Sequence, residues 1–115
     1  MRVRWLARLA LFAATAFAVT MALLPHPPGV VEVGDKYQHM LAFATLSVLA
    51  ALAYPEERLF RLGERLSFLG ALIEVLQAIP ALGRDCDILD WVADTASIAA
   101  VLGVIWLARR RAATW

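Results

Sequence analysis

Four stretches of the chain are apolar over roughly the length of a membrane-spanning helix, and charged or helix-breaking residues separate them. The apolar stretches cover residues 5–24, 37–54, 66–82 and 88–108. The segment PHPPG follows the first stretch and PEER follows the second, and proline does not continue a helix. No stretch alternates apolar and polar residues as a half-buried strand does. The pattern therefore predicts four helices and no sheet.

Composition places these helices in a membrane. Hydrophobic residues make up 62% of the 115 residues, whereas soluble domains contain about 45–50%. A spanning helix needs about 20 apolar residues, so four helices with short connections use nearly the whole chain. We therefore expect one all-α domain, residues 1–115, folded as an integral membrane four-helix bundle.

The first apolar stretch has a second interpretation, as a cleaved signal peptide. Basic residues precede it, and Ala14, Ala16 and Ala18 are small residues of the kind that cleavage sites use. We favour a retained helix because the stretch is long enough to cross a bilayer. Cleavage would leave the orientation of the other three helices unchanged.

The arginines predict the orientation of the bundle. In an up-and-down arrangement of four helices, the N-terminus, the second connection and the C-terminus share one side. These regions hold Arg2, Arg4, Arg8, Arg58, Arg61, Arg65, Arg109, Arg110 and Arg111. Lys36 and Arg84 are the only basic residues of the other two connections. Because basic residues stay on the cytoplasmic side, we expect both termini to be cytoplasmic.

The third and fourth helices carry polar residues that hydrocarbon rejects. Glu74 lies about 12 Å into the third helix, near its middle, and Gln77 follows on the same face. Asp87, Asp90 and Asp94 have i, i+3, i+7 spacing, which places them on one stripe of the fourth helix. Both helices therefore direct acidic or amide groups toward the outer half of the bundle.

The second helix brings further polar residues to the same outer end. An ionised aspartate at a helix centre costs about 2.5–3.5 kcal/mol on insertion scales, so such groups face the bundle interior and find partners. We therefore expect an outward-facing polar pocket between three helices. Its ligand-binding candidates are Asp35, Lys36, His39, Glu74, Gln77, Arg84, Asp87, Asp90 and Asp94.

Three functions are open for this pocket. In the first, Lys36 and Arg84 hold a phosphate or carboxylate headgroup while Asp87 and Asp90 orient Arg84. In the second, which we favour less, the pocket is a membrane enzyme acting on a lipid-linked substrate. In the third, the acids only join the helices by interhelical hydrogen bonds.

The enzymatic alternative has candidate residues but no firm motif. Glu74 and His39 are the candidates for general acid–base catalysis. A divalent metal is conceivable because imidazole and carboxylate groups are suitable ligands. The metal-ligand candidates are His39, Glu74, Asp90 and Asp94. Their spacing matches no tight metal-binding motif, so we assign no cofactor.

Other partners and sites are disfavoured. Nucleic-acid binding has no support because the arginines are explained by membrane orientation. Cys86 is the single cysteine, which excludes an internal disulfide and a paired-thiol metal site. The expected partners are the lipid bilayer and an anionic lipid or lipid-linked envelope precursor. The pattern does not predict an oligomeric state.

Two segments of the chain carry a resemblance to a known family. GDKYQHMLAFATLSVLA begins at residue 34 and EVLQAIPALGRDCDILDWVAD at residue 74. Together they resemble the VanZ-like family of small bacterial membrane proteins over the last three helices. The matching positions are Asp35, Lys36, His39, Phe43, Glu74, Gln77, Pro80, Arg84, Asp87 and Asp90.

The resemblance implies a location and a physiological context. It implies a multi-pass protein of the bacterial cytoplasmic (inner) membrane, and a link to the low-level glycopeptide resistance of the family's namesake, notably to teicoplanin. It implies no biochemical activity. The family usually has Asn and Gly on the last helix where this chain has Asp94 and Ser97. The additional carboxylate changes the charge of the expected pocket, whereas the serine is expected to affect packing.

Overall fold

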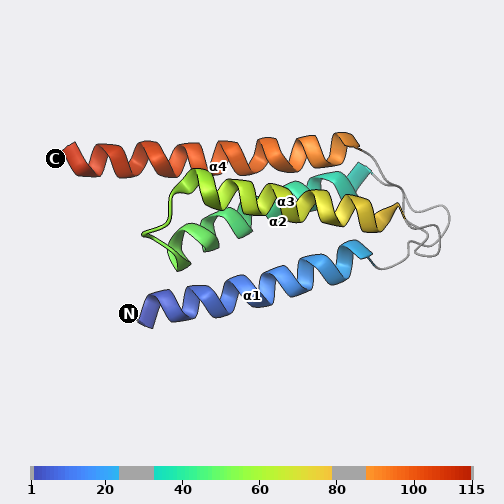
Figure 1. The fold of residues 1–115 in the computed structure, drawn as a ribbon, viewed down its shortest axis with the longest axis horizontal. Helices are drawn as coiled ribbons and strands as arrows, with labels where there is room; N and C mark the ends of the chain where they lie inside the picture. Colours follow the sequence, from blue (N-terminus) through green and yellow to red (C-terminus); the bar gives the residue numbers. More distant parts are fainter. Residues whose placement is uncertain (1, 24–32, 79–87, 115) are drawn as a thin grey trace.

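A computed structural model describes residues 2–23, 33–78 and 88–114, which contain four helices and no strand. The helices are α1 (Arg2–Leu23), α2 (Val33–Ala53), α3 (Leu59–Gln77) and α4 (Ile88–Thr114). Consecutive helices run in opposite directions along the long axis of the molecule (Figure 1). The prediction of an all-α chain with four helices is confirmed for these residues.

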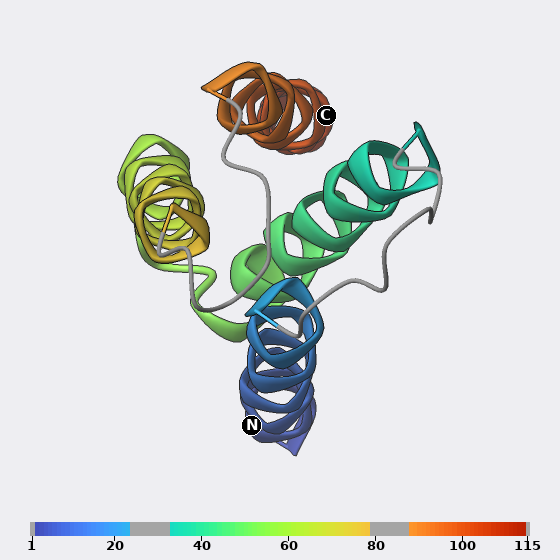
Figure 2. The ribbon, with the colours of Figure 1, turned by 90° about the vertical axis from the view of Figure 1, so that its right-hand side faces the viewer.

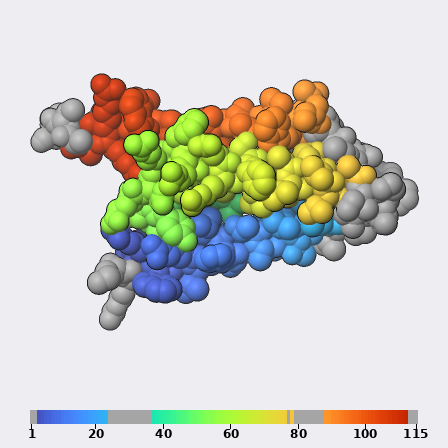
Figure 3. Space-filling model, viewed as in Figure 1, coloured from blue at the N-terminus to red at the C-terminus, as the bar shows by residue number. Residues whose placement is uncertain are grey.

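The helices surround an apolar core to which all four contribute. Viewed along the long axis, α2 lies between α1 and α4, and α3 lies beside α4 (Figure 2). α3 also contacts α1, and Figure 3 shows α3 between α1 and α4 on one face of the molecule. Residues at three- and four-residue spacings turn inward from each helix. The buried core consists of Ala22, Phe43, Leu46, Ala50, Leu62, Leu66, Ile73, Ile98 and Leu102.

Helix boundaries differ from the prediction mainly at α3. This helix begins at Leu59, seven residues before the predicted start at residue 66. Leu59, Leu62 and Leu66 repeat at helical spacing, and all three belong to the core or pack against it. Packing therefore extends the helix into a segment whose charges resemble those of a loop. The predicted end of this helix, residue 82, lies outside the described residues.

The other boundary differences are extensions. α2 begins at Val33 rather than residue 37, which places Asp35 in its first turn, where a carboxylate is favourable near the positive end of the helix dipole. α4 continues from the predicted residue 108 to Thr114. Arginine and alanine favour helix, so the basic segment after Ala108 prolongs α4 rather than ending it.

Two helices are long and apolar enough to cross a membrane. These spans are Val3–Leu23 in α1 and Ile88–Ala112 in α4. Only 11% and 17% of their most apolar windows are buried, whereas the core helix of a soluble protein is mostly buried. The apolar segment of α2, Tyr37–Ala53, is shorter. α3 has 19 residues, about 28 Å, but three charges in its first two turns.

The outer surface of α1 is correspondingly apolar. Phe12 and Phe17 are 67% and 68% exposed, although large hydrophobic side chains in water-soluble proteins are usually buried. A continuous apolar surface of this kind marks contact with a membrane or another protein. Large exposed apolar side chains on α1 are Val3, Trp5, Leu6, Leu9, Phe12, Phe17 and Met21.

The arginine-bearing regions gather at one end of the bundle. We call this the arginine end; it consists of the start of α1, residues 54–58 and the last turns of α4 (Figure 1). The opposite end, where α1 and α3 finish and α2 and α4 begin, is called the polar end. The three regions share one end of the bundle, as the up-and-down arrangement of four helices predicts (Figure 1).

Two arginines cap the C-terminus of α2 at the arginine end. Nη2 of Arg109 donates to the carbonyl oxygen of Ala51, and Nε of Arg8 donates to that of Ala53, both at 3.1 Å. The guanidinium of Arg8 also lies 4.7 Å from the centre of the Tyr54 ring. The last carbonyl groups of a helix lack intrahelical donors, and α2 has no basic residue in its own last turn. Arginines of α1 and α4 therefore donate the hydrogen bonds that these two carbonyl groups of α2 cannot obtain within their own helix.

We predict that Arg109→Met destabilises the bundle by about 1–2 kcal/mol, because it removes a charged donor from a backbone carbonyl and leaves the apolar stem in place. Unfolding by sodium dodecyl sulfate in mild detergent measures this change. Arg110→Met is the matched control: Arg110 stacks on Trp106 at 5.2 Å, a contact worth about 0.5 kcal/mol at an exposed site. Equal losses in the two variants would contradict the capping role of Arg109.

Candidate functional site

Two carboxylates are buried in the part of the bundle nearer the polar end. Glu74 of α3 is 5% exposed and Asp94 of α4 is 3% exposed. Helical spacing turns both inward: Glu74 follows the buried Gly70 by one turn, and Asp94 precedes the core residue Ile98 by one turn. Burial of a charged group is expensive unless it has partners, and each of these acids interacts with other groups of the chain. The prediction that these acids face the interior is therefore met.

Interhelical hydrogen bonds surround Asp94 and hold α4 against its neighbours. Nε1 of Trp91 donates to the carbonyl oxygen of Ser67 at 2.9 Å, and the hydroxyls of Ser67 and Thr95 are 2.9 Å apart. On the other side, Oγ of Ser97 donates to the carbonyl oxygen of Met40 at 3.0 Å. The segment of α4 that carries Asp94 is thus bonded to both α3 and α2.

At Gly70, one turn before Glu74, α3 lies close to both of these helices. A Cβ atom at Gly70 would lie 3.4 Å from Cδ1 of Trp91 and 3.5 Å from Cζ of Phe43. Phe43 belongs to α2 and Trp91 to α4, so the three helices meet at this level. A side chain as small as alanine at this position would make ordinary van der Waals contacts with both helices.

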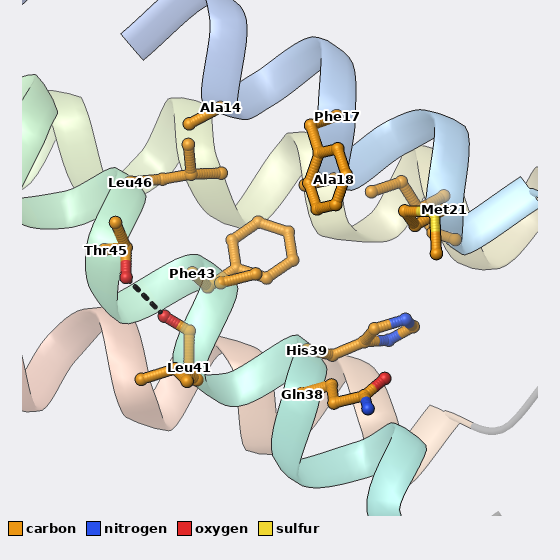
Figure 4. Close-up of a pocket in the computed structure, with 13 residues that line it drawn as sticks. Ala14, Phe17, Ala18, Met21, Gln38, His39, Leu41, Phe43, Thr45 and Leu46 are labelled. Atoms are coloured by element: carbon orange, nitrogen blue, oxygen red, sulfur yellow. Dashed lines mark hydrogen bonds between the residues drawn. The ribbon is translucent and has the colours of Figure 1, made fainter. Parts of the chain in front are cut away.

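A cavity of about 480 Å³ lies between α1 and α2 (Figure 4). Its walls are mostly apolar, and Ile73 of α3 contributes to them. Gln38 and His39 lie together at the side near Met21, toward the polar end, whereas Ala14 and Leu46 lie at the other side. Polarity within the cavity is therefore concentrated at one end.

One further polar residue lines this cavity without changing its apolar character. The hydroxyl of Thr45 donates to the carbonyl oxygen of Leu41 at 2.9 Å, within α2 itself (Figure 4). Such a bond uses the only donor of the threonine. Gln38 and His39 are thus the nitrogen-bearing side chains that the cavity presents.

The predicted ligand-binding residues do not all meet in this cavity. His39 lines it, whereas Glu74 and Asp94 are buried elsewhere in the bundle and Asp90 is half-buried on α4. The remaining candidates lie outside the described part of the structure. The backbone of Asp35, Lys36 and Gln77 belongs to helices, but their side chains are not described. Arg84 and Asp87 fall in the segment between α3 and α4, which is not described.

The structure does not assemble the metal site that the sequence left open. Among the described residues, no three His, Cys, Asp or Glu side chains are grouped so as to hold a metal ion. His39 lines the cavity between α1 and α2, whereas Glu74 and Asp94 face the interior from α3 and α4. The cavity that His39 lines does not include Glu74, Asp90 or Asp94 among its walls.

Sequence reasoning missed residues that the geometry makes important. Gln38 lines the cavity beside His39, and its polarity within an apolar stretch is the signal that identifies it. Ser67, Thr95 and Ser97 form interhelical hydrogen bonds. Their partners are distant in sequence, so spacing alone does not reveal these bonds.

No protein-family model, curated protein or solved structure matches this chain. The resemblance to the VanZ-like family therefore rests on the motif residues of the sequence and stays a prediction.

We predict that Ser97→Ala destabilises the bundle by about 0.6–1.7 kcal/mol, because it removes a hydrogen bond between two helices. Ser47→Ala is the control: Ser47 is fully buried, and its hydroxyl donates at 2.7 Å to Phe43 within the same helix, a bond that adds little to helix stability. Detergent unfolding of both variants tests this. A larger loss in Ser47→Ala would contradict the interhelical role assigned to Ser97.

Proposed function

We propose that this chain is a VanZ-like multi-pass protein of the bacterial cytoplasmic (inner) membrane with both termini inside. At its polar end it binds an anionic ligand, either an envelope lipid or lipid-linked precursor or a glycopeptide-type molecule. The single observation that carries the proposal is the burial of Glu74 and Asp94 in a bundle whose outer surface is apolar.

Two features support the membrane assignment. The spans in α1 and α4 expose their apolar side chains rather than burying them, which suits contact with hydrocarbon. The sequence has eleven basic residues. Nine of them, all but Lys36 and Arg84, lie at the arginine end or within two helical turns of it. That asymmetry matches the excess of basic residues on the cytoplasmic side of membrane proteins.

Charge balance supports an anion-binding role for the polar end. Buried carboxylates gain most from a charged hydrogen-bond donor, and guanidinium and ammonium groups are the strongest such donors. In our proposal, Asp87 and Asp90 orient Arg84, and Lys36 is the other basic residue that the sequence places in the connections of this end. Both cations then present donors to a phosphate or carboxylate group at the outer surface.

The alternative of a carboxylate–histidine enzyme has weaker support. Glu74 and His39 are its acid–base candidates, yet the cavity lined by His39 does not include Glu74. The structural alternative, in which the acids only join helices, predicts that Glu74→Gln alters thermal stability and leaves ligand binding intact. Measurements of ligand binding therefore separate the binding proposal from the structural alternative.

We predict that Arg84→Ala weakens binding of an anionic lipid by about tenfold to a hundredfold, because loss of a charged donor costs about 1.5–3 kcal/mol. Native mass spectrometry of protein released from gentle detergent measures the lipid retained by each variant. Arg58→Ala, which removes an exposed arginine from the opposite end, is the control and should retain lipid like the wild type. An Arg84→Ala protein that folds normally and keeps its lipid would refute the proposal.

A further inference from the structure

We infer that the cavity between α1 and α2 holds a hydrocarbon chain of an amphipathic anionic lipid, which enters sideways from the bilayer. This inference deepens the proposed function and rests on it for the chemistry of the headgroup. It adds the class of ligand: a lipid with at least one long chain, rather than a small water-soluble anion.

The shape of the cavity favours a chain. Its volume of about 480 Å³ falls in the usual range of small-molecule sites, roughly 300–1,000 Å³. Ala14, Ala18 and Ala42 are small wall residues from the two facing helices, and they leave room along the helix axes. A mostly apolar space of this volume along two antiparallel helices (Figure 1) suits a hydrocarbon chain.

The mouth of the cavity lies on the apolar outer surface. Phe17 and Met21 of α1 and Leu41 of α2 are among its lining residues and are 68%, 51% and 69% exposed. In the proposed orientation these side chains contact lipid directly. In our proposal, a ligand enters the cavity from the bilayer past these exposed side chains.

Polarity orients the chain. Gln38 and His39 occupy the end of the cavity that faces the polar end (Figure 4). A headgroup that carries hydrogen-bond acceptors is complementary to the amide donors of Gln38 and the imidazole of His39. The hydrocarbon tail then extends toward Ala14 and Leu46, away from these groups.

Headgroup contacts decide which lipid binds. Lipid chains are as apolar as the cavity walls, so transfer of a chain from bilayer to cavity gains little from the hydrophobic effect. The cavity therefore favours lipids whose chain is long enough to enter it. The polar end favours lipids with a negatively charged headgroup. Loss of the headgroup site is expected to weaken binding of long-chain and short-chain lipids alike. Loss of the cavity is expected to weaken binding of the long-chain lipid only.

A second groove between α3 and α4 is less suited to this ligand. It has a volume of about 680 Å³ and is also largely apolar. Its lining includes the carboxylate of Glu64, which repels an anionic headgroup, and the hydroxyls of Ser67 and Thr95, which bond to each other. This groove provides an internal comparison for the test.

The test uses dioleoyl and dihexanoyl phosphatidic acid, which share a headgroup and differ in chain length, added to the full chain in detergent. Ala18→Leu places a larger side chain in the α1–α2 cavity, and Ala99→Leu makes the same change in the α3–α4 groove. We expect Ala18→Leu to weaken dioleoyl binding about tenfold and to leave dihexanoyl binding unchanged. Ala99→Leu should change neither. Native mass spectrometry reports both, and the melting temperature of each variant reports folding.

Arg84→Ala separates failure of this inference from failure of the proposed function. If Arg84→Ala weakens both lipids and Ala18→Leu weakens neither, the headgroup site stands and the chain site is overturned. If Ala18→Leu weakens the dioleoyl lipid and Arg84→Ala weakens neither, the chain site stands and the headgroup assignment fails. Weaker dioleoyl binding in Ala99→Leu alone would place the chain in the α3–α4 groove and overturn the inference.

A measurement on the unaltered chain keeps the inference falsifiable if Ala18→Leu does not fold. A phosphatidic acid with a photoreactive diazirine in its chain is bound to the wild type and irradiated. Crosslinks within residues 14–22 and 38–46 are expected, since these segments line the cavity. Crosslinks confined to residues 91–106, which line the other groove, would overturn it.

Discussion

In our account, the cost of placing a charged or hydrogen-bonding group in hydrocarbon governs the arrangement of the four helices. Apolar side chains cover α1 and α4 on the outside, while Glu74 and Asp94 turn inward. The arginines gather at one end, where Arg8 and Arg109 bond to the last carbonyl groups of α2. In our account, the buried acids avoid hydrocarbon in the interior and these arginines avoid it at the end of the bundle.

α2 connects the two ends and both proposed parts of the site. At the arginine end its carbonyl groups accept bonds from α1 and α4; nearer the polar end, the carbonyl of Met40 accepts the hydroxyl of Ser97. His39 of α2 lines the cavity between α1 and α2. Phe43 of α2 lies next to Gly70 of α3, one turn before Glu74. In our account, α2 therefore places a headgroup site next to a chain site, so that one amphipathic molecule occupies both.

Much of this arrangement follows from local pattern. Apolar stretches of spanning length and the spacing of the arginines predicted four helices, their alternating direction and the common end of the basic regions. The start of α3 did not follow, because Leu59 and Leu62 extend the helix through packing against other helices. The bond from Ser97 to Met40 joins residues 57 apart, and the direction of His39 toward α1 depends on how α2 rotates. Spacing within one helix determines neither, because both depend on how neighbouring helices pack.

Labelling of single cysteines tests most directly the claim that the two ends lie on opposite sides of a membrane. Cys86, the only cysteine, lies in the connection between α3 and α4, which the account places outside; Glu56→Cys in a Cys86→Ser background marks the arginine end. A membrane-impermeant maleimide is applied to spheroplasts before and after permeabilisation. The account predicts that Cys86 reacts in intact spheroplasts and that the cysteine at position 56 reacts only after permeabilisation. Reaction of both sites in intact spheroplasts, or of position 56 alone, would contradict it.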